Sequence, residues 1–176
     1  MRHERLVFID ESGARTNMTR RCGRAKHGAR CVDAAPCGGR QSTTMISSVR
    51  PDGSAASMVI DGATTAEVFK ACVERVLLPT LRPGDVVVLD NLSAHKNQRI
   101  REMIESVGAQ LWFLPAYSPD LNPIEKMWSK VRAKLRAIKA RSPDALLAAI
   151  GKALRSITPS DVKGWFASCG YPNTIS

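Results

Sequence analysis

The chain has 176 residues, of which 44% are hydrophobic and 24% are charged. A chain of this size can bury one sizeable core but is short for two, so we expect a single domain over residues 1–176. The sequence holds no uncharged apolar run long enough to cross a membrane, and the start MRHERLVFID does not resemble a secretory signal, which favours a soluble, cytoplasmic protein.

The positive charge of the chain is large and clustered. Twenty-six Lys and Arg against sixteen Asp and Glu leave a net charge of +10. Six basic residues lie between Glu11 and Asp33 without an acid, and seven more lie from Lys126 to Arg141. A merely solvated surface usually mixes both signs, so blocks of one sign favour a polyanionic partner, above all nucleic acid.

The cysteines argue against a disulfide framework. There are five, an odd number, and no two form a CxxC pair, so we expect reduced thiols. The segment with Cys22, His27, Cys31 and Cys37 could supply four zinc ligands, but its spacing matches no common zinc pattern.

The first half of the chain predicts three strands. Arg5–Asp10 is a short apolar run that ends in an acid and reads as a buried strand, followed by a Gly- and Arg-rich loop to about Gln41. Two more runs, Thr43–Val49 and Ala55–Ile60, flank the turn signal Pro51-Asp52-Gly53 and predict a hairpin. We therefore expect three antiparallel strands.

The second half alternates helices and strands, which predicts parallel neighbours covered by helices and a mixed-sheet α/β domain. Val86–Leu89 is apolar on both faces, as is typical of a central strand. The tail from Asp161 carries no clear signal. The expected elements are a helix from Thr64 or Thr65 to about Leu78, the strand Val86–Leu89, a helix Asn97–Val107, a strand Gln110–Pro115, a helix from Asn122 to about Ala140 and a helix from Ser142 to about Ile157.

The helix from Asn122 is long and amphipathic. At helical spacing, Glu125 shares one face with Ser129, Arg132 and Arg136, so a basic row leads away from this acid. Trp112 is expected in the core as well. The residues expected to be buried in the helix are Ile124, Met127, Trp128, Val131, Leu135 and Ile138.

Three acids are candidates for one site. Asp10 and Asp90 each end a predicted strand, and Glu125 lies in the first turn of the long helix. If the first and fourth strands are neighbours, the three carboxylates meet, and two such charges 4 Å apart repel by roughly 4 kcal/mol at an effective dielectric near 20. Hard carboxylate oxygens favour Mg²⁺ or Mn²⁺, and a pair of such ions can drive phosphodiester chemistry.

Each acid also has a structural alternative. Asn122-Pro123-Ile124-Glu125 fits a capping box, Asp90 with Asn91 could start a turn, and Asp10 could pair with an arginine. The joint placement of the three favours a functional site.

Polar residues beside the acids are candidates for a supporting role. His95 could carry a proton, orient a ligand or cap the next helix. Asn91 and Asn122 could donate hydrogen bonds to the carboxylates or to phosphate.

Three motifs carry a family resemblance: FIDES at Asp10, VVVLDNLSAHK at Asp90 and LPAYSPDLNPIEKMWSKVR at Glu125. With them the chain resembles bacterial insertion-sequence transposases of the mariner-like superfamily (insertion sequence six-thirty family), and the 34 residues between Asp90 and Glu125 match the spacing in that family. The resemblance implies a ribonuclease-H-like fold with a mixed five-stranded sheet and helices on both faces. It further implies that Asp10, Asp90 and Glu125 are catalytic and bind two Mg²⁺ ions, for which Mn²⁺ can substitute.

The implied activity is cleavage of DNA at transposon ends and strand transfer into target DNA, at TA dinucleotides, by a homodimer or larger assembly. Complete members begin with helix-turn-helix modules, whereas here the first strand starts within ten residues of Met1. We therefore expect the catalytic half of a split or frameshifted gene, served by a separately encoded helix-turn-helix half, or a truncated relic. The residues expected to bind DNA are Arg15, Arg20, Arg21, Arg24, Lys126, Lys130, Arg132, Lys134 and Arg136.

Two rival functions stay open on sequence alone. One is a ribonuclease-H-like nuclease without strand transfer. The other is a non-catalytic DNA-binding fragment that associates with or inhibits a full-length transposase.

Overall fold

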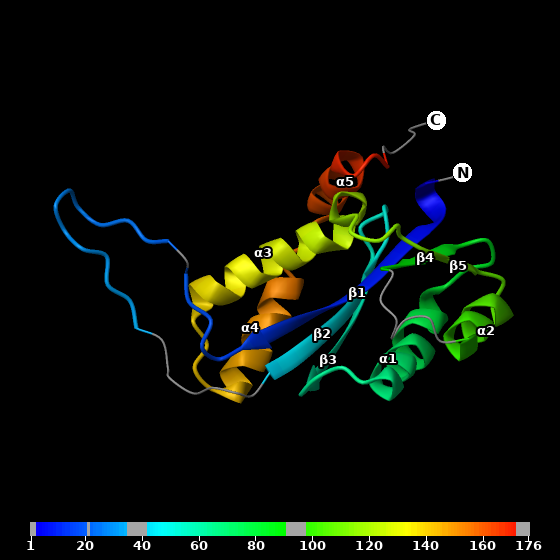
Figure 1. The fold of residues 1–176 in the computed structure, drawn as a ribbon, viewed down its shortest axis with the longest axis horizontal. Helices are drawn as coiled ribbons and strands as arrows, with labels where there is room; N and C mark the ends of the chain where they lie inside the picture. The colour runs from blue at the N-terminus through cyan, green and yellow to red at the C-terminus, as the bar shows by residue number, and fades with distance from the viewer. Residues whose placement is uncertain (1–2, 21, 35–41, 91–97, 172–176) are drawn as a thin grey trace.

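The protein is described by a computed structural model that covers residues 3–20, 22–34, 42–90 and 98–171. Its centre is a five-stranded mixed sheet with the strand order β3-β2-β1-β4-β5 (Figure 1). β1, β2 and β3 are antiparallel, whereas β4 and β5 run parallel to β1, so the expected mixed sheet is confirmed. The strands are β1 Leu6–Arg15, β2 Ser42–Val49, β3 Ala55–Asp61, β4 Val86–Leu89 and β5 Gln110–Phe113.

Helices cover both faces of the sheet (Figure 1). α3, α4 and α5 pack on one face, and α1 and α2 pack on the other. No helix in the described ranges is long and apolar enough to cross a membrane. The helices are α1 Ala66–Cys72, α2 Gln98–Ser106, α3 Pro123–Ile138, α4 Pro143–Leu154 and α5 Pro159–Ser168.

The alternation of side chains along β1 separates the core into two halves. Leu6 and Phe8 face α3, α4 and α5, where Trp128 is completely buried, whereas Val7 and Ile9 face α1 and α2. Because successive residues of a strand point to opposite faces, Asp10 shares the face of Leu6 and Phe8. This parity sets the side of the sheet on which the acid lies.

The predicted hairpin between β2 and β3 is confirmed, and one glycine in its turn is required. Gly53 has a φ of 91°, and a Cβ there would come within 2.9 Å of Pro159 at the start of α5. A side chain at this position would be strained and would also collide with α5.

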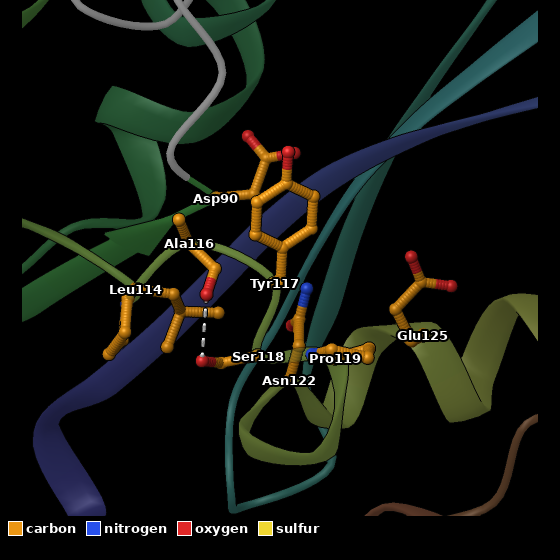
Figure 2. A pocket seen from close by; sticks show the side chains of 9 residues that line it. Asp90, Leu114, Ala116, Tyr117, Ser118, Pro119, Asn122 and Glu125 are labelled. Carbon is orange, nitrogen blue, oxygen red and sulfur yellow. Dashed lines mark hydrogen bonds between the residues drawn. The ribbon is translucent and has the colours of Figure 1, made fainter.

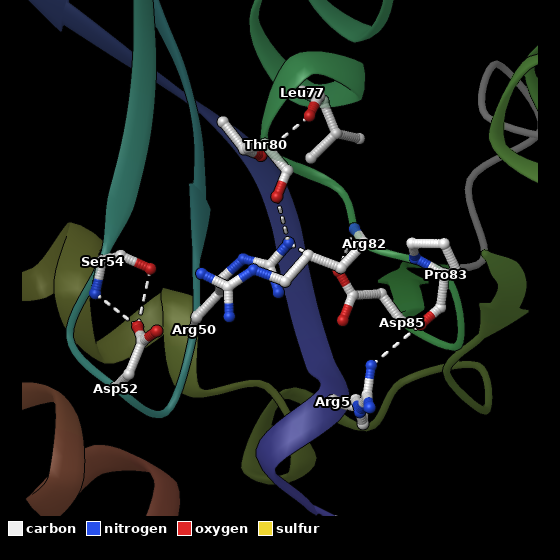
Figure 3. Close-up of polar contacts among 9 residues, drawn as sticks. All are labelled: Arg5, Arg50, Asp52, Ser54, Leu77, Thr80, Arg82, Pro83 and Asp85. Atoms are coloured by element: carbon white, nitrogen blue, oxygen red, sulfur yellow. Dashed lines mark hydrogen bonds and ion pairs between the residues drawn. The ribbon is translucent and has the colours of Figure 1, made fainter. Parts of the chain in front are cut away.

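A buried ion pair fixes the end of the sheet where β2 ends and β4 begins (Figure 3). Arg50 Nη2 donates to Asp85 Oδ2 and to the carbonyl of Thr80, each at 2.7 Å, and the backbone N–H of Arg82 donates to the same Asp85 oxygen. The Arg50 and Asp85 side chains are only 8% and 1% exposed. The pair therefore ties the helical turn after α1 to the central strands.

Some sequence predictions were wrong. β1 does not end at Asp10 but continues to Arg15, because Glu11–Arg15 pairs with β2. Trp112 and Ile138 were expected in the core but are 46% and 42% exposed, since one lies on the edge strand β5 and the other at the last turn of α3.

The last helix, α5, was missed. Its start carries a readable signal, a capping box in which Thr158 and Asp161 bond reciprocally to each other's backbone N–H.

Candidate active site

Two of the three candidate acids lie side by side on neighbouring parallel strands. Phe8 of β1 stands opposite Val88 of β4, so two residues further on Asp10 meets Asp90, just beyond the end of β4. The expectation that the first and fourth strands are neighbours is thus confirmed. By strand parity both acids point toward the face covered by α3, and Glu125 lies in the first turn of that helix.

The pKa of Asp10 is consistent with acids that lie near one another. Burial, together with the negative charges of Glu125, Asp90 and Glu11, raises the pKa of Asp10 to about 7, although a backbone hydrogen bond at Glu11 opposes the rise. Asp10 is only 6% exposed. A buried acid beside like charges either keeps a proton or needs a cation, so the donor set suits a hard divalent ion.

The acids do not form a ready-made metal cage. Within the described ranges, no three His, Cys, Asp or Glu side chains are grouped closely enough to hold one ion. Glu125 Oε2 instead pairs with Arg132 Nη2 at 3.5 Å, and Figure 2 shows the carboxylates of Asp90 and Glu125 on different sides of the pocket. Glu125 is therefore oriented by an arginine of its own helix.

This pocket is a cavity of about 340 Å³ lined by Asp90, Glu125, Asn122 and the loop Leu114–Pro119. The capping box considered for Asn122 and Glu125 is absent, since the Asn122 side chain makes no capping hydrogen bond and Glu125 faces Arg132. Asn122 is 6% exposed, and its Oδ1 has no hydrogen-bond partner among the described residues. A buried amide oxygen without a partner at a pocket wall is available to a ligand or an ordered water.

The loop between β5 and α3 is held by a residue that the sequence did not single out. Tyr171 Oη donates a hydrogen bond of 3.0 Å to the carbonyl of Leu121, and the Tyr171 ring packs against Phe8. The chain after α5 thus supports the turn that precedes Glu125. No local motif around Tyr171 signals this contact.

A second, larger groove of about 530 Å³ lies between the later half of β1 and α3. Of the described part of β1, only Leu6–Phe8 pairs with β4, which leaves the following residues with an open edge. The groove is lined by three arginines, Arg15, Arg132 and Arg136. Its wall also includes Ser12 and Thr64, whose buried hydroxyl oxygens have no partner within the described structure. Guanidinium groups with unpartnered hydroxyls fit phosphate oxygens well.

The basic residues of α3 fall on two different flanks of the helix. With 100° between successive residues, Arg132 and Arg136 share the side of Glu125, as expected from the sequence. The row of Lys126, Lys130 and Lys134 lies on the opposite flank, beyond the buried stripe. Lys130 Nζ already pairs with Asp161 of α5 at 2.5 Å.

The basic loop between β1 and β2 holds other predicted DNA contacts. Arg20 and Arg24 are exposed and border a shallow pocket at the C-terminal end of α3. Arg141 donates to the carbonyls of Thr16 and Met18 and so fixes the start of this loop. Three predicted site residues, Arg21, Asn91 and His95, lie outside the described residues.

The cysteines of the described structure are unbonded. Cys22 and Cys31 are exposed in the basic loop, and Cys72 and Cys169 are buried. Burial raises the pKa of the Cys72 thiol to about 11, so this side chain behaves as a core residue. Cys37 lies outside the described residues.

Comparison with known proteins gives one family. A family model described as DDE superfamily endonuclease matches residues 5–147. The chain is 26% identical over 148 residues to the transposable element Tc1 transposase of Caenorhabditis elegans. The aligned region covers 84% of this chain and 52% of that relative. The chain is 31% identical over 85 residues to the Tcb2 transposase of Caenorhabditis briggsae, covering 46% of this chain and 31% of that one. The chain thus spans about half or less of the length of these relatives.

Solved structures show the same fold at low sequence identity. The Mos1 strand transfer complex superposes with a TM-score of 0.69 at 15% identity, over 94% of this chain and 51% of that chain. The Mos1 transposase catalytic domain, solved with raltegravir and Mg, superposes with a TM-score of 0.62 at 16% identity, over 97% of this chain and 79% of that chain. The catalytic core domain of BIV integrase superposes with a TM-score of 0.55 at 17% identity, over 96% of this chain and 99% of that chain. The fold is therefore ribonuclease-H-like, as the resemblance implied.

Proposed function

Because the chain belongs to the family of DDE superfamily endonucleases, we propose that it acts as the catalytic domain of a DNA transposase. The proposed reaction is metal-dependent cleavage of DNA at transposon ends, followed by transfer of the freed 3′-hydroxyl to target DNA. The observation that carries this proposal is that Asp10 lies beside Asp90 on the face of the sheet covered by the helix of Glu125.

The three acids would hold two Mg²⁺ ions, with Mn²⁺ as a substitute. Support comes from their oxygen-only donors and from the raised pKa of Asp10, which reflects burial first and the neighbouring negative charges second, both of which a bound cation would offset. When bound, such a pair of ions activates the attacking water or hydroxyl and stabilises the leaving oxygen.

The protein's own residues would prepare this site. Burial of Asp10 keeps bulk water away from one side of it, and Asn122 offers an unpartnered amide oxygen at the pocket wall. Arg132 holds the Glu125 carboxylate on the groove side of α3. Asn91 and His95 follow Asp90 in sequence and remain candidates for orienting it or moving a proton.

DNA would approach along the groove of Arg15, Arg132 and Arg136, which adjoins the helix of Glu125. We further propose that the unit acts on paired DNA ends as a homodimer or larger assembly, because Mos1 transposase was solved as a paired-end complex with the left transposon end. A separately encoded helix-turn-helix half would supply sequence recognition, since phosphate contacts alone carry little sequence information.

The proposal is tested by nicking of a supercoiled plasmid in Mg²⁺ or Mn²⁺. Asp10→Asn, Asp90→Asn and Glu125→Gln are each expected to lower the rate by more than about 100-fold, since even outer-shell partners of metal ligands typically contribute 10- to 100-fold. Glu105→Gln is a matched control, because this exposed acid pairs only locally with Arg101 on α2. Equal rates for parent and Asp90→Asn would overturn the catalytic role.

Strand transfer separates a transposase from a plain nuclease. A labelled DNA end with a free 3′-hydroxyl is incubated with plasmid, and a joined product is expected. The pairing of Glu125 with Arg132 favours one alternative, a non-catalytic DNA-binding fragment. That alternative predicts DNA binding without metal-dependent nicking.

A further inference from the structure

One aromatic side chain at the rim of the candidate active site is left completely in solvent. Tyr117 is 102% exposed, the highest value among the large hydrophobic residues that the structure describes, and it lines the same cavity as Asp90 and Glu125. Figure 2 shows its ring standing over the pocket. Within the described ranges, Tyr117 makes no hydrogen bond and no ring contact with another residue. No contact among the described residues therefore accounts for an aromatic residue here.

The backbone at Tyr117 is strained as well as exposed. Its φ of 58° lies in the left-handed region, which bulky residues rarely adopt. The other described non-glycine with positive φ is Lys139, which caps the C-terminal end of α3, where such a conformation is common. Tyr117 follows no helix. Strain of this kind persists where the surroundings impose it, and it often accompanies a functional site.

Rigid residues flank Tyr117 on both sides. Pro115 and Pro119 lie two residues before and after it, and each fixes its own φ. Beyond Pro119 the turn is anchored by the hydrogen bond from Tyr171 to Leu121. The loop therefore restricts the backbone around Tyr117 in advance, which lowers the conformational entropy lost when a ligand binds.

The chemistry of the cavity selects the ligand for this ring. Two carboxylates, Asp90 and Glu125, stand at the wall, and the Tyr117 ring offers a flat apolar face beside them. A nucleotide presents both matching groups, a phosphate that cations can bridge to the acids and a planar base. Bases stack on aromatic side chains with little regard to sequence.

We propose that Tyr117 stacks on the nucleobase next to the scissile phosphate and so positions the DNA strand over Asp90 and Glu125. The inference rests on the proposed function, since it assumes that DNA enters this cavity. It assigns to Tyr117 a contact with the base rather than with the phosphate. Because both faces of a base inside a duplex are covered by its neighbours, the base that stacks on this ring lies at a strand end or is splayed out of the duplex.

The test uses the full chain and a DNA duplex with a single-stranded 3′ tail that carries 2-aminopurine. Binding is measured in Ca²⁺, so that it does not depend on turnover. The parent protein is expected to change the 2-aminopurine fluorescence through stacking. Tyr117→Ala should lose this signal and bind the tail about 5- to 150-fold more weakly. Tyr117→Phe should keep both.

Three comparisons make the test specific. On a tail with an abasic site in place of 2-aminopurine, parent and Tyr117→Ala should bind equally. Trp112→Ala, which removes another exposed aromatic residue, on the edge strand β5, should behave like the parent. Tyr117→Gly should lose the stacking signal yet unfold at an equal or higher temperature, because glycine relieves the strained φ.

The outcomes distinguish this proposal from the proposed function. If Tyr117→Ala binds the base-containing tail as tightly as the parent while plasmid nicking persists, the stacking proposal is wrong and the function stands. If Tyr117→Phe behaves like Tyr117→Ala, the hydroxyl rather than the ring makes the contact, and stacking is again refuted. Stacking by the parent without any nicking in Mg²⁺ would support Tyr117 and refute catalysis. No binding of either tail would refute both.

Discussion

Replacing Arg132 and Arg136 with alanine is expected to reduce the salt dependence of DNA binding. Both side chains line the groove beside β1, on the flank of α3 that carries Glu125. Each phosphate contact adds about 0.9 to the slope of the logarithm of the binding constant against the logarithm of salt concentration. The double variant should therefore bind with a slope lower by about 1.8.

The size of this effect is measurable. Over a fourfold rise in salt, from about 50 to about 200 mM, the affinity of the parent should fall about 12-fold more than that of the double variant. The assay is fluorescence anisotropy of a labelled duplex without divalent metal, at several salt concentrations. Each single variant should lower the slope by about 0.9.

The matched control removes the same charge from the other flank of the helix. Lys126→Ala with Lys134→Ala lowers the net charge equally but acts on the flank of α3 opposite to Glu125. Its slope should change by clearly less than 1.8. If both double variants flatten the slope equally, net charge rather than the groove governs binding. If neither does, α3 does not contact the phosphates.

Two further predictions concern stability. Asp85→Ala should lower the free energy of unfolding by about 3–5 kcal/mol, because it leaves the Arg50 guanidinium buried without its partner. Adding Arg50→Met should recover part of this loss. A loss below about 1 kcal/mol, measured by denaturant unfolding, would contradict the prediction. The second prediction concerns Asp161, whose pKa is lowered from 3.8 to about 2 by the hydrogen bond from Lys130 together with those from Thr158. The ionised Asp161 carboxylate therefore stabilises the folded protein fully above pH 3.8, and this stabilisation is lost as the pH falls toward 2. Asp161→Asn should therefore have a lower melting temperature than the parent at neutral pH, and the difference should disappear on acidification. A difference in melting temperature that does not depend on pH would exclude the ion pair as its cause.

Local signals in the sequence were sufficient for most elements. The apolar run Val86–Leu89 could be placed at the centre of a sheet because both of its faces are apolar. The turn at Gly53 and the cap at Thr65 were also readable, since each depends on neighbours a few residues away. The predictions for Trp112 and Ile138 were wrong because periodicity identifies the apolar face of a helix or strand but does not show how far the packed neighbouring elements cover that face.

The sequence by itself determined that Asp90 follows a strand, that Glu125 begins a helix, and that the chain is basic enough to bind a polyanion, whereas Asp10 lies inside β1 rather than at its end. Only the tertiary structure decided that β1 and β4 are parallel neighbours in a register that brings Asp10 beside Asp90. It also decided that Glu125 pairs with Arg132 rather than capping its helix. The physical reason is that apolar periodicity and turn signals depend on residues close together in the chain, whereas strand neighbours depend on residues far apart, and the partner of Glu125 depends on the side-chain conformations of the packed helix.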